Sequence, residues 1–130
     1  MALRRWIQPI LLISATLLML FSAVVTATVS IPHLREDMLE INVRPTLLGA
    51  IMTGLHFSSF AMAAFSLITL AAAGKSVRGQ AIDKISVGIV GAVYLCFGIV
   101  SFISTGSHHT LGYVLIGVLL FAAIAIPDNY

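Results

Sequence analysis

Four long apolar runs, each free of Asp, Glu, Lys and Arg, dominate the sequence and limit what the chain can fold into. They extend over residues 10–31, 46–73, 85–105 and 110–126. A bilayer core about 30 Å thick is crossed by about 20 helical residues, with about 17–25 as the usual range. Backbone N–H and C=O groups in lipid must form hydrogen bonds with one another, so only helices and closed barrels cross the bilayer. Because the runs lack the alternation of barrel strands, they predict four membrane-spanning helices.

The composition argues against a soluble fold. Of the 130 residues, 59% are hydrophobic and 9% are charged, whereas a soluble domain is roughly 45–50% apolar and about 25% charged. A soluble chain of this size buries only about two-thirds of its surface. We therefore predict an all-α integral membrane protein, a single domain over residues 1–130 that forms a four-transmembrane-helix bundle with short loops. The expected spans are approximately 8–31, 46–73, 85–105 and 109–126.

The first run also resembles a signal peptide. Arg4 and Arg5 precede it, and Val25-Thr26-Ala27 is an acceptable cleavage site. Its apolar stretch, however, exceeds the about 7–15 residues that are usual in signal peptides. We expect it to be retained as the first span.

Basic residues predict the orientation. One side of the expected membrane carries five of them, Arg4, Arg5, Lys75, Arg78 and Lys84, and the opposite side carries Arg35 and Arg44. Because Lys and Arg are enriched in cytoplasmic loops, we predict a multi-pass protein with both termini in the cytoplasm. Trp6 would anchor that side at the membrane interface.

No Lys/Arg-rich run is present, so we expect no nucleic-acid partner.

Small and polar residues recur at helical spacing and mark the faces expected to point into the bundle. In membranes, small residues let helices approach closely. The expected inner stripes are Ala15, Met19, Ser22, Thr26 and Ser30 in the first span, Gly49, Thr53, His56, Ser59, Ala63 and Ser66 in the second, Gly88, Gly91 and Gly98 in the third, and His109, Tyr113, Ile116, Leu120 and Ala123 in the fourth.

His56 is the most informative candidate residue. It lies about ten residues into the second span, which at about 1.5 Å per residue puts it near the midplane. Ionisable residues at that depth usually face a cavity or the bundle interior. Thr53 and Ser59 would complete a ligand-binding set with it. Two interpretations stay open: a neutral histidine that joins helices, or a group that binds a ligand, a proton or a metal.

Two further histidines begin the fourth span. His109 precedes Tyr113 by four residues, so an imidazole and a phenol would share a helix face. His56, His109 and Tyr113 are the candidate catalytic residues. The alternative is that His108 and His109 simply meet water and headgroups at the interface.

The first connection predicts a short amphipathic helix on the membrane surface. Leu34, Met38 and Ile41 recur at helical spacing. On the other side, His33, Asp37 and Glu40 form a weak candidate metal site, because imidazole and carboxylates ligate several divalent metals. His108 and His109 are weak metal candidates as well. A solvated charged face is the competing interpretation.

The function expected from these features is that of a small accessory or structural subunit of a larger membrane complex. The loops are short, and no Walker loop, dinucleotide fingerprint, zincin motif or nucleophile elbow occurs. The expected partners are the lipid bilayer and other membrane subunits or a second copy of the chain. Spans without Lys or Arg exclude a voltage sensor, and the lack of an acidic residue disfavours a transporter driven by a membrane carboxylate.

Two alternatives remain. The first is a membrane enzyme or binding protein for a lipid-soluble substrate such as a quinone, a sterol or an isoprenoid, in which His56 transfers a proton or donates a hydrogen bond. The second is haem binding by His56 and His109, or copper binding with Met52 beside His56.

Overall fold

The computed structural model of the chain describes residues 2–128, with side chains from Arg5 onward, and all their regular structure is helical. The elements are α1 (Ala2–Val25), a π-helical turn (Thr26–Ser30), α2 (Ile31–Glu40), α3 (Pro45–Val77), α4 (Lys84–Thr105), a 3₁₀ turn (His108–Thr110) and α5 (Leu111–Ala125). Four continuous helices are long and apolar enough to cross a membrane. The predicted helical class and the four predicted long helices are therefore confirmed.

The first two of these helices are longer than predicted. The continuous helix Arg5–Glu40 has 36 residues and α3 has 33, whereas Lys84–Thr105 has 22 and His108–Ala125 has 18. The predicted first span ended at residue 31, but the helix continues through Pro32. Directly before Pro32 lies a π turn, in which the backbone N–H of Ile31 donates to the carbonyl of Thr26. Prolines and π turns are both places where a continuous helix departs from the regular hydrogen-bond ladder.

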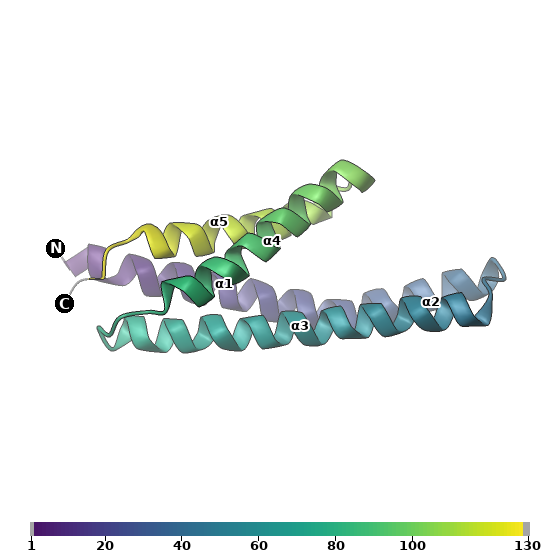
Figure 1. Ribbon diagram of the computed structural model, residues 1–130, viewed down its shortest axis with the longest axis horizontal. Helices are drawn as coiled ribbons and strands as arrows, with labels where there is room; N and C mark the ends of the chain where they lie inside the picture. The colour runs from purple at the N-terminus through teal and green to yellow at the C-terminus, as the bar shows by residue number, and fades with distance from the viewer. Residues whose placement is uncertain (1, 129–130) are drawn as a thin grey trace.

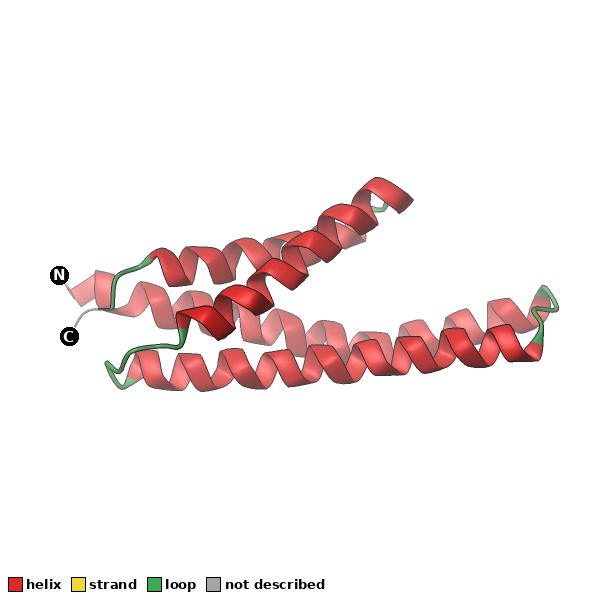
Figure 2. Cartoon of the chain, viewed as in Figure 1, coloured by secondary structure: helices red, strands yellow, loops and turns green. Residues whose placement is uncertain are grey.

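The helices form two hairpins (Figure 1). In the first hairpin, α1 and α2 run beside α3, and in the second, α4 runs beside α5. Helices α1 and α5 join the hairpins, while α3 and α4 contact each other only over a short stretch. The start of α1, the segment that follows α5 and the α3–α4 connection lie at one end, which we call the closed end (Figure 1). Toward the opposite, open end the hairpins diverge, and the connections between helices are short (Figure 2). The amphipathic segment of the first connection is helical as predicted, but it extends α1 along its axis.

The core lies among α1, α3, α4 and α5. Leu12, Met19 and Leu120 are fully buried there. The predicted inner stripe of the fourth span is largely confirmed, because Ile116, Leu120 and Ala123 are buried. The stripe of α3 is confirmed only in part: Ser59 and Ser66 are buried, but Thr53 and His56 are exposed. The second hairpin diverges from α3 toward the part of this helix that holds His56 (Figure 1).

Glycines let α4 and α5 pack closely. A Cβ added at Gly117 would lie 2.8 Å from the Cβ of Leu95 and 2.9 Å from the carbonyl oxygen of Gly91. One added at Gly98 would lie 2.7 Å from the backbone nitrogen of Val114. Real Cβ atoms do not approach backbone this closely, so the second hairpin depends on both glycines.

The first hairpin is joined by hydroxyl contacts instead. The hydroxyl oxygens of Thr16 and Thr69 lie 2.8 Å apart. Each is also within hydrogen-bonding distance of a carbonyl on its own helix, Leu12 for Thr16 at 2.8 Å and Ser66 for Thr69 at 3.0 Å. Both side chains are buried, so this contact leaves no hydroxyl unpaired at the centre of the hairpin.

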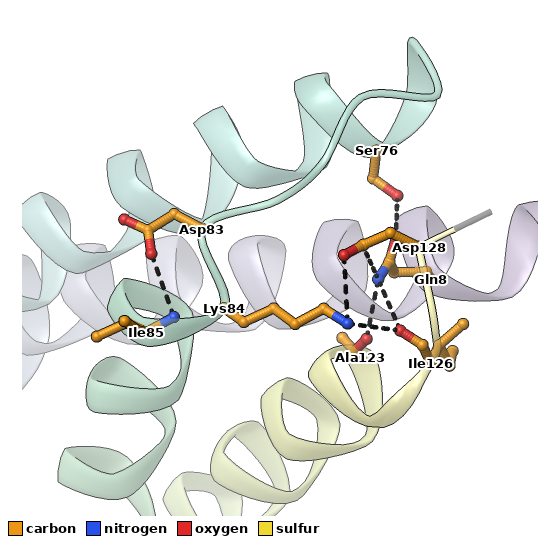
Figure 3. A network of polar contacts seen from close by, with 8 residues as sticks. All are labelled: Gln8, Ser76, Asp83, Lys84, Ile85, Ala123, Ile126 and Asp128. Atoms are coloured by element: carbon orange, nitrogen blue, oxygen red, sulfur yellow. Dashed lines mark hydrogen bonds and ion pairs between the residues drawn. The ribbon is translucent and has the colours of Figure 1, made fainter. Parts of the chain in front are cut away.

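A polar network fastens the closed end (Figure 3). Gln8, which is 7% exposed, donates its Nε2 to the carbonyl of Ala123 at 3.1 Å and accepts a hydrogen bond from the Ser76 hydroxyl at 2.8 Å. One side chain of α1 thereby holds the ends of α3 and α5. Lys84 pairs with Asp128 at 3.2 Å and donates to the carbonyl of Ile126 at 3.3 Å.

The start of α4 belongs to the same end. The Asp83 carboxylate accepts hydrogen bonds from the backbone N–H groups of Ile85 and Ser86 and caps the helix. The hydrogen bonds from the side chain and backbone of Ser86 lower the pKa of Asp83. The cap therefore stays charged at neutral pH, where it satisfies backbone donors that have no partner within the helix.

Replacing Gly117 by Ala is expected to lower the free energy of unfolding by about 1–3 kcal/mol, because the added methyl overpacks the α4–α5 contact. The matched control is Gly112→Ala on the same helix, where an added Cβ meets nothing within 4 Å. Unfolding in mixed micelles measures both. Equal stability of the two variants would contradict the described packing.

The Gln8→Ala variant is expected to lose about 1–3 kcal/mol of stability, because the Ser76 hydroxyl and the end of α5 lose a buried partner. In a double-mutant cycle with Ser76→Ala, the second substitution should cost much less once Gln8 is absent. Additive losses would show that the two side chains do not interact.

Candidate functional site

The predicted ligand-binding residues do not converge on one pocket. His56 is exposed and lines a groove of about 450 Å³ together with Arg35 and Met52. Thr53 is exposed as well, and its hydroxyl donates to the carbonyl of Gly49 on its own helix. Ser59 is buried, and its hydroxyl has no hydrogen-bond partner among the described residues. Of the three residues, His56 lines this groove and the other two do not.

His56 lies toward the open end of the molecule. It is separated by 20 residues of α3 from Ser76 in the closed-end network, which corresponds to about 30 Å at about 1.5 Å per residue. The sequence placed it near the middle of a span that begins at residue 46. In α3, which has 33 residues from Pro45 to Val77, His56 is the twelfth residue and lies five residues before the centre of the helix.

His109 and Tyr113 share a second pocket, of about 440 Å³. The π turn supplies hydroxyls to the same pocket, because Thr26 and Ser30 line it from the first hairpin. His108 points elsewhere and lies near Phe102, with 6.3 Å between the ring centroids. The predicted association of His109 with Tyr113 on one side of the helix therefore agrees with the structure, and the two adjacent histidines diverge.

The weak metal candidates are not gathered into a site. His33 and Asp37 lie four residues apart on α2 with 3.9 Å between Nε2 and Oδ2, and both side chains are exposed. Within residues 5–128, no three His, Cys, Asp or Glu side chains come together in an arrangement that could hold a metal ion. Glu40, His108 and His109 consequently add no further ligand to the His33–Asp37 pair.

A third pocket, of about 420 Å³, lies between the two hairpins. We call it the aromatic pocket because five rings line it: Phe57, Phe65, Tyr94, Phe97 and Tyr113. The ring centroids of Tyr94 lie 6.3 Å from Phe65 and 6.2 Å from Tyr113, and Phe97 lies 5.1 Å from Tyr113. These are the usual separations of interacting aromatic pairs.

Tyr94 is the residue that sequence reasoning missed. Its side chain is 3% exposed, and its hydroxyl has no hydrogen-bond partner among the described residues. Buried tyrosine hydroxyls ordinarily find one. The signal was present in the sequence, because Tyr94 lies in the middle of the third apolar run and away from the interfaces where tyrosines are usual.

Comparison with known proteins gives no match: no family model, no curated protein and no solved structure is significantly similar to this chain.

The groups that line the pockets are suited to binding. Rings, methyl groups and a few hydroxyls shape and orient a lipophilic molecule, as in most ligand pockets. The pocket that His109 lines also holds hydroxyl groups from another helix, Ser22 and Thr26 among them.

Proposed function

We propose that this chain is a multi-pass integral membrane protein that serves as an accessory subunit of a larger membrane complex. The observation that carries the proposal is the first hairpin, which is longer than the second and is left uncovered at the open end. The partner is a protein with membrane-spanning helices of its own.

The exposed surface favours lipid and protein contacts over water. Phe57, Phe60, Ile85 and Ile103 are each at least 74% exposed. Exposed apolar side chains of this size are covered by lipid or by another protein. Together with four helices of sufficient length and hydropathy, they support insertion into a bilayer.

The closed end is the proposed cytoplasmic end. Its described basic residues are Arg5, Lys75, Arg78 and Lys84, and α1, the α3–α4 connection and α5 all reach it (Figure 1). Excess Lys and Arg in short loops marks the cytoplasmic side. Trp6, which is largely exposed near this end, has the interfacial position typical of tryptophan.

The first hairpin extends beyond the second. Its first helix is 14 residues longer than α4 (36 against 22), which amounts to about 20 Å at about 1.5 Å per residue. The extension carries the exposed charged side chains of α2 next to exposed apolar ones such as Leu39 and Ile41. A surface supplied by a partner would cover these exposed side chains.

Glycines on the same part of α3 would admit a partner helix. An added Cβ at Gly49 or Gly54 meets nothing within 4 Å. In membranes, exposed small residues allow close approach of another helix. The partner surface proposed here therefore combines α2 with the first turns of α3.

Blue-native electrophoresis after gentle solubilisation at native expression level tests the proposal. The chain is expected to migrate with a mass well above that of its own monomer or dimer, and a tagged copy should co-purify a distinct membrane protein in fixed ratio. Migration as a free monomer or homo-oligomer would contradict the proposal.

Matched substitutions on α3 locate the partner surface. Gly54→Leu should dissociate the complex, because the larger side chain blocks helix approach, while Gly74→Leu on the same helix should leave it intact. Neither position crowds an added Cβ within the chain. Equal effects of both variants would place the partner elsewhere.

Cysteine labelling tests the orientation. In a chain in which Cys96 is replaced by Ser, a cysteine at Glu40→Cys should react with a membrane-impermeant maleimide in intact cells. A cysteine at Gln80→Cys should react only after permeabilisation. The reverse pattern would show that the termini are not cytoplasmic.

A further inference from the structure

The groove between α2 and α3 carries a cation without a counter-ion. Arg35 and His56 are the two ionisable residues that line this groove, and both are exposed. Neither of the ion pairs among the described residues involves Arg35, and the acidic residues of α2 do not line the groove. An anion can therefore enter beside the Arg35 guanidinium without displacing an existing ion pair.

The position of the groove along the first hairpin determines its depth in the proposed bilayer. His56 lies 20 residues along α3 from Ser76 of the closed-end network, which is about 30 Å at about 1.5 Å per residue and equals the thickness of the hydrocarbon core. With the closed end at the inner edge of the core, His56 therefore lies at its outer edge. Arg35 is five residues before the end of α2 at Glu40, whereas His56 is eleven residues after the start of α3 at Pro45. Arg35 is thus six residues nearer to the turn between these helices, and it lies about 9 Å farther out than His56.

The phosphate groups of a bilayer lie within this interval. The hydrocarbon core is about 30 Å thick and the whole bilayer about 40–45 Å, so each head-group layer is about 5–8 Å thick. A phosphate in the outer layer is therefore level with the part of the groove between His56 and Arg35. Arginine binds phosphate oxygens through a planar fork of N–H donors, and a neutral imidazole donates one N–H to the same kind of acceptor.

The remaining walls suit the apolar part of a phospholipid. Ile31, Leu48 and Met52 line the groove between the two polar groups. Gly49 lines it as well, and because an added Cβ there meets nothing within 4 Å, the wall of α3 is set back at this point. The volume of about 450 Å³ lies within the range of about 300–1,000 Å³ that is usual for small-molecule sites. The groove thus has room for the glycerol phosphate end of a lipid.

We infer that the groove between α2 and α3 binds a phospholipid, with the phosphate held between Arg35 and His56 and the acyl chains continuing into the surrounding bilayer. The occupant is a lipid phosphodiester rather than free phosphate, because the groove lies at the depth of the bilayer phosphates and most of its walls are apolar. This inference rests on the proposed insertion into a bilayer. It leaves room for the proposed partner helix, which approaches α3 at Gly54, a residue that does not line the groove.

Native mass spectrometry of the detergent-solubilised chain tests the inference by measuring the lipid that each chain retains. The probe is dioleoyl-phosphatidylglycerol, and dioleoylglycerol is the matched lipid without a phosphate. Saturable binding of the phospholipid is expected, with dioleoylglycerol binding at least about tenfold more weakly. Arg35→Gln should weaken phospholipid binding about ten- to a hundredfold, as expected for loss of a hydrogen bond to a charged group. Arg44→Gln makes the same change of charge at the same end of the molecule but outside the groove, so it should leave the affinity unchanged.

Two leucine substitutions separate the lipid site from the proposed partner surface. Gly49→Leu places a side chain in the groove and should abolish phospholipid binding, whereas Gly54→Leu should leave it unchanged. Neither position crowds an added Cβ within the chain.

Resistance to carbonate extraction, measured for the parent chain and every variant, reports insertion into the membrane separately. A chain that inserts but binds both lipids equally would overturn the lipid site and leave the proposed insertion intact, while a chain that carbonate extracts would overturn both. Equal affinities of the Arg35→Gln and Arg44→Gln variants, or complete displacement of the lipid by inorganic phosphate, would also overturn the inference.

Discussion

Gln8 is the contact on which the arrangement of the helices depends. Its amide joins α1 to the end of α3 through Ser76 and to the end of α5 through the carbonyl of Ala123. Lys84 and Asp128 add an ion pair between α4 and the segment that follows α5. In a chain with so few polar side chains, these interactions all lie at one end. The opposite end has no comparable network among the described residues, which is why the hairpins are close at the first end and diverge at the other.

This asymmetry decides where ligands can bind. In the half near the closed end, threonine hydroxyls and small residues fill the space between helices, as at Thr16 and Thr69. In the diverging half, the gap between hairpins is wide enough for two pockets, and Thr26 and Tyr113 line both of them. The two pockets are therefore adjacent.

Much of the fold follows from the sequence, because uncharged apolar runs of this length leave the backbone few alternatives to helices. The inner faces of α4 and α5 could be predicted for the same reason: small residues recur at helical spacing, and each helix has its neighbour along its full length. His56 shows where such reasoning ends. A helical stripe indicates which residues share a side, but only the neighbouring helix determines whether that side is covered. Tyr94 was overlooked because a tyrosine within an apolar run resembles an ordinary core residue until the lack of a partner for its hydroxyl is known.

The π turn has a consequence for the first helix as a whole. Its hydrogen bond joins residues five apart instead of four, so it holds one residue more than an α-helical turn and rotates everything after it by about 100°. The stripe that contains Ala15 and Met19 was expected to continue to Ser30, yet Ser30 is exposed and Ile31 is buried in its place. The stripe of residues that faces the rest of the bundle is therefore displaced by one residue after the turn, so the two halves of this helix present different sides of their sequence to α3. A single-residue deletion within the turn would restore one continuous phase and swing the charged side of α2 to a new direction without altering any residue of α2 itself.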